Sequence, residues 1–345
     1  MKEGIKNKDR FAKRIRTKRL LMIAFLSLFL TPYSLIVSQN TVEQEAQFKY
    51  YWYAAKQAIQ EERYADAYAL LEFCEMIKPN DGQTLTFLGI LYNGIGRKES
   101  AKDLFRTAFE ADPGDQWYHY TNVLLEQRTM EGFYEAQGVM EKALKANPKN
   151  EELIEQLERM YMSDGQWKKA MEMQNRLDAI RGFNAYSAMN KYRIYYSWGK
   201  PKKAIEVIDQ YLELDPTNVE FLIFRVEVLE QMNAKPAVLY AAYEKVLSLS
   251  TNPRILNNYA YHLATHKGDL QRAERMSEQT IRENPNYPVY LDTYGWILHL
   301  KGQDELAKFY LNKALDGING GMYLFENDDA EKVKNEVQKH LNAIK

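Results

Sequence analysis

The sequence is poor in the residues from which catalytic and metal sites are most often built. Its 345 residues include one cysteine, Cys74, and five histidines. A single cysteine excludes an intramolecular disulfide and any zinc site with several cysteine ligands. The sequence also lacks a glycine-rich phosphate loop and a G-x-S-x-G nucleophile motif. We therefore expect a non-enzymatic protein without a cofactor. Its composition, 46% hydrophobic and 27% charged, is that of a globular chain.

Positive charge is scarce beyond the first forty residues. Residues 1–39 contain nine lysines and arginines and two acidic residues, whereas residues 40–345 contain 37 basic and 45 acidic residues. The body of the chain therefore carries a net charge of −8. Because nucleic-acid binders depend on positive charge to attract phosphate groups, we expect no nucleic-acid partner.

The basic N-terminal stretch runs directly into an apolar segment. Residues 20–30 (LLMIAFLSLFL) contain one polar side chain, and the small residue Ser38 follows soon afterwards. A basic region, an apolar region of this length and a small residue at its end are typical of a secretory signal. We therefore predict a signal peptide over residues 1–38, cleaved after Ser38 or Gln39. Residues 39–47 would then form a short N-terminal segment of the mature chain.

An uncleaved signal anchor is the alternative. Residues 20–37 are 18 residues long, at the lower edge of a membrane span, and Pro32 weakens that interpretation. In both cases the positive-inside rule sends the rest of the chain out of the cytoplasm. We expect an exported protein in the periplasm or associated with the outer membrane. The alternative is an inner-membrane protein anchored by residues 20–37, and only such an anchor would contact the membrane.

Behind this segment one pattern recurs every 34 or 35 residues. It is an alanine, then an aromatic or aliphatic residue four positions later, then a small residue three further on. The aligned positions are Ala67, Ala101, Ala136, Ala170, Ala204, Leu239, Ala273 and Ala307. Prolines close most units, and mid-unit turns are marked by Gly96, Gly165, Gly199, Gly268 and Gly302. Three independent markers with one period indicate a tandem repeat.

Each unit is expected to fold as two amphipathic helices joined by a tight turn. In the second unit the two apolar faces are formed by Leu85, Leu88, Gly89 and Tyr92, and by Ala101, Leu104, Phe105 and Ala108. Between them Gly96 supplies the backbone angles of the turn. Pro113 cannot continue a helix and ends the unit. The small Gly89 and Ala101 should allow the two helix backbones to approach closely.

These features resemble the tetratricopeptide repeat (TPR) family, whose 34-residue pattern is W-x2-L-G-x2-Y, then A-x3-F-x2-A, then P. The resemblance implies an all-α fold, a right-handed TPR superhelix or α-solenoid of about eight helix-turn-helix repeats over residues 48–321. The repeats would span 48–81, 82–115, 116–150, 151–184, 185–218, 219–253, 254–287 and 288–321. Cys74 would occupy a small core position as an inert buried thiol.

Residues 322–345 are expected to form a C-terminal capping helix. Ala330, Val333, Val337, Leu341 and Ile344 would share one face of it. A solenoid needs such a half-polar cap over its last apolar face.

Three units depart from the pattern, and one of them, the fourth, ends at Gly182 without a proline. The third lacks a clear turn glycine and has Glu131, Gly132 and Phe133 in its place. The sixth has Pro236 near its turn and one extra residue, so its register is open. These departures concern local geometry and leave the expected architecture unchanged.

In TPR proteins the first helix of each repeat lines a concave groove, so the resemblance implies a binding surface there. Projecting the face away from the core gives the candidate partner-binding residues Trp52, Lys56, Tyr118, Arg159, Tyr186, Met189, Arg193, Tyr196, Asn258, His262, Asp292, Trp296 and His299. Tyrosine, tryptophan and arginine are the residue types that most often anchor interfaces. The carboxylate clamp with which some TPR proteins hold chaperone tails is not reproduced, because Trp52 and Lys56 occupy its first two positions.

The expected function is a protein- or peptide-binding scaffold in the envelope of a Gram-negative bacterium, in envelope assembly or secretion. Three alternatives stay open. The groove aromatics could stack on cell-wall glycans, or they could pack against the neighbouring repeat and bind nothing. His262, His266 and His299, on adjacent repeats, could form a metal site. The motif HLATH has Leu263 where a zincin requires glutamate, which favours solvent-exposed histidines instead.

Overall fold

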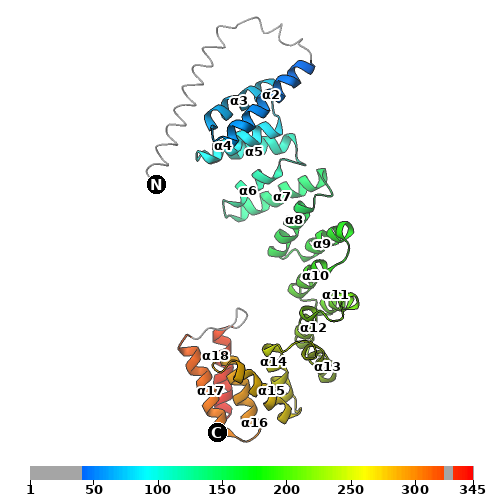
Figure 1. The fold of residues 1–345 in the computed structure, drawn as a ribbon, viewed down its shortest axis with the longest axis vertical. Coiled ribbons are helices and arrows are strands. Elements are labelled where there is room, and N and C mark those ends of the chain that lie inside the picture. The colour runs from blue at the N-terminus through cyan, green and yellow to red at the C-terminus, as the bar shows by residue number, and fades with distance from the viewer. Residues whose placement is uncertain (1–40, 322–328, 345) are drawn as a thin grey trace. The chain divides into compact units, whose positions relative to one another are not determined.

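The computed structural model describes residues 41–321 and 329–344, and within these ranges it contains 17 α-helices and no strand (Figure 1). The predicted all-α fold is confirmed. The predicted signal peptide, residues 1–38, and the alternative anchor, residues 20–37, lie outside the described residues. Among the helices that the structure does describe, none has the length and apolar character needed to span a membrane.

Two compact units make up the chain, residues 1–181 and 182–345. The described part of the first unit consists of four helix hairpins. Its helices are α2 (Thr41–Gln60), α3 (Tyr64–Ile77), α4 (Gly82–Gly94), α5 (Lys98–Ala111), α6 (Trp117–Leu125), α7 (Met130–Ala146), α8 (Glu151–Ser163) and α9 (Trp167–Arg181). In each hairpin the two helices pack mainly against each other, as two amphipathic helices joined by a short turn should.

Four more hairpins and a final helix form the second unit. Its helices are α10 (Ala185–Ser197), α11 (Pro201–Leu214), α12 (Val219–Gln231), α13 (Pro236–Leu247), α14 (Pro253–Thr265), α15 (Leu270–Glu283), α16 (Pro288–Leu300), α17 (Asp304–Asn319) and α18 (Ala330–Ala343). The final helix α18 packs on both α17 and α16. Val337 is fully buried and Val333 and Leu341 join the same cluster, whereas Ala330 is exposed.

The first helix begins earlier than the repeat pattern suggests. Residues 41–47, assigned from the sequence to a separate N-terminal segment, continue α2 toward the N-terminus without a break. The stretch contains neither glycine nor proline, so nothing in it disfavours helical geometry.

The turn residues follow the predicted glycines at four of the five positions. Gly96, Gly165, Gly199 and Gly302 all have positive φ angles. In the seventh repeat the residue with positive φ is Lys267 rather than Gly268, and in the third it is Arg128. These two turns are therefore made by residues that no glycine signal could have identified.

Two other glycines allow close contact between helices. A Cβ atom built on Gly89 would lie 2.5 Å from the Phe105 ring, and one on Gly132 would lie 2.4 Å from the carbonyl oxygen of Leu124. The predicted close approach at Gly89 is confirmed. Gly132 lies inside α7 and not in the turn, so its role is to let α7 pack against the end of α6.

Many of the 25 tyrosines place the ring in the core and the hydroxyl on a neighbouring helix. Tyr120, Tyr161 and Tyr259 are buried, and their hydroxyls donate to Glu135, Glu141 and Glu244 at 2.6, 2.7 and 2.7 Å. Burial raises the pKa of these three hydroxyls, which keeps them protonated as donors. Tyrosine thus fills a core position and fixes the next helix at once.

The lone thiol is part of this core. Cys74 is fully buried on α3, and burial raises its pKa to about 11. Because the thiolate is the reactive form, a thiol with this pKa is inert at neutral pH. The sequence-based assignment of Cys74 as a buried core residue is confirmed.

Candidate binding site

The first-helix residues proposed from the sequence differ widely in exposure. The exposed ones are Lys56, Tyr118, Arg159, Tyr186, Arg193 and Tyr196. Trp52, Met189, Asn258, His262, Trp296 and His299 are half-buried, and Asp292 is buried. The projected face is therefore open at some repeats and covered at others.

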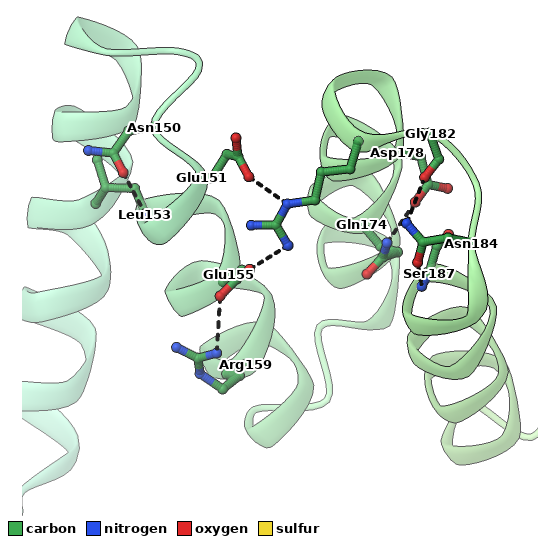
Figure 2. A network of polar contacts seen from close by, with 11 residues as sticks. Asn150, Glu151, Leu153, Glu155, Arg159, Gln174, Asp178, Gly182, Asn184 and Ser187 are labelled. Carbon is green, nitrogen blue, oxygen red and sulfur yellow. Dashed lines mark hydrogen bonds and ion pairs between the residues drawn. The ribbon is translucent and has the colours of Figure 1, made fainter.

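In the first unit this face is partly taken up by internal contacts. The Trp52 ring packs edge-on against Phe87 of the next hairpin, with 5.0 Å between ring centroids. Arg159 pairs with Glu155 at 3.9 Å, and Glu155 also accepts from Arg181 at 2.7 Å (Figure 2). Trp52 is therefore better described as a residue that packs against the neighbouring repeat than as a free anchor for a partner.

The first helix of the second unit has the most open part of the face. On α10, Tyr186 is 49% exposed and Tyr196 is 39% exposed, and Arg193 between them is exposed as well. Met189, in the same row, packs against the core of the α10–α11 hairpin. The Tyr196 ring lies 5.6 Å from that of Tyr192, which supports it from below. Three anchors of the preferred types thus stand on one helix.

The histidines do not gather into a metal site. The rings of His262 and His266 stack with 5.1 Å between their centroids, but His299 lies against Asp304, with Nδ1 2.7 Å from Oδ1. Over residues 41–321 and 329–344 no group of three or more His, Cys, Asp or Glu side chains is arranged to hold a metal ion. The alternative built on His262, His266 and His299 is therefore wrong for the described structure.

The last repeat is covered by the C-terminal helix, which corrects two of the proposed groove residues. His340 of α18 stacks on the Trp296 ring, with centroids 4.3 Å apart and planes 17° apart. Its Nδ1 lies 2.8 Å from Asp292 Oδ1. Asp292 and Trp296 face away from the core of their own hairpin, as the projection predicts, but α18 takes up that space. Projecting the exposed face of α16 from its sequence cannot show that α18, which begins at Ala330, covers that face.

Beside this contact lies a cleft of about 640 Å³, the principal candidate binding site. We refer to it as the C-terminal cleft. It is bounded by first helices of three successive repeats and by α18. Its lining consists of Glu230 on α12; Asn257, Asn258, Tyr261 and His262 on α14; Val289, Asp292 and Thr293 on α16; and Asp329, Lys332, Val333 and Glu336 at α18.

Asn257 lines this cleft and carries an unpaired buried acceptor. Its side chain is only 3% exposed, and its Oδ1 atom is buried without a hydrogen-bond partner among the described residues. Its neighbour Asn258 points Nδ2 toward Glu230 at 3.5 Å. A buried polar atom without a partner costs folding free energy, about 1–3 kcal/mol, and marks a place where something else could bind.

The electrostatics of the C-terminal cleft are acidic. It has four carboxylates, and its one lysine, Lys332, makes no ion pair with any described residue. Burial raises the pKa of Glu230 and of Asp292, the latter despite the nearby His340. Burial also lowers the pKa of His262, so this imidazole adds no positive charge at neutral pH. The cleft therefore has four carboxyl groups and one lysine, and burial shifts two of the four, Glu230 and Asp292, toward the neutral form.

Sequence reasoning found part of this cleft and missed the rest. Asn258, His262 and Asp292 were among the projected residues. Asn257 was not, because its position on α14 belongs to the packed side of the helix. An asparagine at a position where the pattern expects an apolar residue is the signal that could have identified it. The contribution of α18 follows only from the tertiary structure.

Known proteins support the fold. The tetratricopeptide repeat model matches residues 82–115 and 193–218. The mouse protein N-alpha-acetyltransferase 16, NatA auxiliary subunit, is 22% identical over 257 residues, which cover 70% of this chain and 29% of the mouse protein. A chain in the solved structure of Naa15/Naa10 bound to HypK-THB superposes with a TM-score of 0.60 at 15% identity, over 87% of this chain and 46% of that one.

A further solved structure is a tetratricopeptide repeat protein from Parabacteroides merdae, with 12% identity and a TM-score of 0.39 over 85% of this chain and 99% of that one. The coverages of 29% and 46% mean that this chain spans less than half the length of the mouse relative and of the Naa15/Naa10 chain. The 34-residue period, the paired helices, the two matched repeats and the shared architecture together show a tetratricopeptide-repeat fold.

Proposed function

We propose that this chain is a non-enzymatic scaffold that binds a protein or peptide partner along the first helices of its repeats. It would be exported and act in the periplasm or at the outer membrane, in envelope assembly or secretion. The N-terminal charge pattern and apolar segment support the export proposal.

The observation that carries the binding proposal is the open face of α10. Tyr186, Arg193 and Tyr196 are exposed together on one helix. A few such residues dominate the binding free energy of most interfaces, because they bury a large area and also form hydrogen bonds. Repeat proteins present such anchors along an extended surface, one repeat after another.

The name of the mouse relative supports a scaffold role. That protein is an auxiliary subunit of an acetyltransferase, and the Naa15/Naa10 structure is an assembly of several proteins. These names do not identify the partner of this chain, because the likeness covers only part of those proteins.

The test is selection of binders from a displayed random peptide library with the full chain, followed by affinity measurement on variants. Tyr196→Ala should weaken binding of the selected peptides about thirtyfold, equal to about 2 kcal/mol at a hot spot. The control is Tyr134→Ala on α7, the second helix of its repeat. Tyr134 is 48% exposed, against 39% for Tyr196, and its loss should change affinity less than twofold.

A stability control separates binding from folding. Tyr195 is half-buried and packs on the α10–α11 core, so Tyr195→Ala should lower the thermal midpoint more than Tyr196→Ala does. The proposal fails if the library yields no binder. The assignment of α10 fails if Tyr196→Ala and Tyr134→Ala have equal effects. Binding of isolated cell-wall polymers, with no peptide selected, would favour the glycan alternative instead.

A further inference from the structure

We propose that the C-terminal cleft binds a positively charged side chain, an arginine in the first place, from an extended segment of the partner. This inference rests on the proposed function and gives the partner a chemical requirement. It concerns the second unit alone, because every lining residue lies between Glu230 and Glu336.

The lining has four carboxyl groups and one lysine, Lys332, beside neutral groups that can both donate and accept. Carboxylates come from three different elements: Glu230 from α12, Asp292 from α16, and Asp329 and Glu336 at α18. An anionic ligand would be repelled by this set. Asp292 already pairs with His340 and Glu336 with Lys339, so a neutral apolar ligand would leave Glu230 and Asp329 without an ionic partner among the described residues. A cation with several N–H groups matches both the charge and the hydrogen-bonding requirement.

Asn257 is the second, independent observation. Its Oδ1 is an acceptor that is enclosed by the fold and has no donor among the described residues. Folding alone does not explain an asparagine there, because a leucine of similar size would fill the position without an unpaired polar atom. A hydrogen-bond donor on a bound ligand would pair with the Asn257 oxygen and so account for an asparagine at this position.

Arginine fits these features better than lysine. Its guanidinium group has five N–H donors in one plane and no acceptor, and it stacks on aromatic rings. Tyr261 supplies such a ring in the lining, and its hydroxyl is oriented toward Glu336, 3.4 Å away. The carboxylates and the Asn257 oxygen would then receive donors from a single group.

The first experiment uses the smallest probe of this chemistry. The full chain is titrated with N-acetyl-arginine amide and with N-acetyl-citrulline amide, which has the same shape without the charge, and binding is followed by NMR. We expect saturable shifts for the arginine probe and at least tenfold weaker binding of the citrulline probe. Equal binding of the two probes, or no binding of the arginine probe, would overturn the inference.

Variants then assign the site. Asn257→Leu removes the unpaired acceptor, and Glu230→Gln removes one charge while keeping an acceptor for the Tyr243 hydroxyl. Each variant should bind the arginine probe at least tenfold more weakly than the original chain does. The control Glu220→Gln makes the same charge change on an exposed residue of the same helix α12, and should change affinity less than twofold. An equal loss in all three variants would mean unspecific attraction by the acidic surface and would overturn the site.

The source of the cation and the parent proposal are tested separately. Peptides selected by the full chain should lose at least tenfold in affinity when their arginine is replaced by citrulline. Peptides that depend on Tyr196 but tolerate citrulline and Asn257→Leu would overturn this inference and leave the proposed function intact. Tight binding of the free polyamine spermidine, with no arginine-dependent peptide, would overturn the assignment to a peptide side chain.

Discussion

The imidazole Nδ1 of His340 lies 2.8 Å from the carboxylate Oδ1 of Asp292, and both side chains are buried. His340 belongs to α18 and Asp292 to α16, the first helix of the last repeat. The His340 imidazole also stacks on the Trp296 ring, with 4.3 Å between the two ring centroids. One histidine thus attaches the C-terminal helix to the groove side of the last repeat.

The first prediction concerns this attachment. His340→Ala leaves the Asp292 carboxylate buried without its partner, so we expect a loss of about 2 kcal/mol in the stability of the last repeat and α18. Hydrogen exchange of the α18 amides should accelerate accordingly. The control is His266→Ala, which alters an exposed histidine at the C-cap of α14. Unchanged exchange in α18 would show that the apolar contacts of Val337 and its neighbours hold the helix without His340.

The parts of this fold that the sequence predicted are those determined within one repeat. Gly89 and Phe105 are sixteen residues apart, and their contact follows from the pattern of one hairpin. Cys74 could be assigned to the core for the same reason, because its position in the repeat is occupied by a small buried residue. Period, pattern and packing are local here, so the sequence alone carries them.

The parts that the sequence did not predict depend on distant segments. Asp292 and His340 are 48 residues apart, and the apolar pattern of α18 indicates one buried face without indicating which helix covers it. The turn at Arg128 is a related case, because a non-glycine residue with positive φ leaves no compositional signal. The exposed candidates on α10 come from the same helical projection that gave Trp52 and Asp292, which other helices cover. A helical projection predicts the direction in which a side chain points, but only the tertiary structure shows which other helix packs against it.

The second prediction compares two glycines on α4. Gly89→Ala places a Cβ atom 2.5 Å from the Phe105 ring, and we expect overpacking to cost about 1–3 kcal/mol. Gly94→Ala meets nothing within 4 Å, and the better helix propensity of alanine should stabilise the protein by about 0.5–1 kcal/mol. Urea unfolding of both variants measures the difference. Equal effects would refute the close contact between α4 and α5.

The third prediction concerns export. If residues 1–38 are a cleaved signal, the chain isolated from its native host should begin at Gln39 or Asn40. Intact-mass measurement of the envelope fraction tests this. A mass that retains residues 20–37 in the membrane fraction would favour the anchor. An uncleaved chain in the cytoplasm would contradict both interpretations.

The fourth prediction is a pH dependence of stability in the first unit. Glu158 on α8 is buried, and burial together with the charge of Glu155 raises its pKa from 4.5 to about 7. The folded state therefore binds a proton more tightly than the unfolded state does. Between about pH 4.5 and pH 7 the contribution of Glu158 to stability falls as the pH rises, and above pH 7 it stays at its lowest value.

Replacing Glu158 by glutamine removes this titration. The stability gained by Glu158→Gln relative to the original chain should be small near pH 4.5 and grow to about 3 kcal/mol at pH 8, since one pKa unit corresponds to about 1.4 kcal/mol. Urea unfolding at pH 5 and pH 8 measures the gain. Glu152→Gln, on the same helix at an exposed position, provides the control and should show no such growth. A gain that is equal at both pH values would mean that Glu158 titrates near its ordinary pKa, because the difference between the two measurements arises only from the raised pKa.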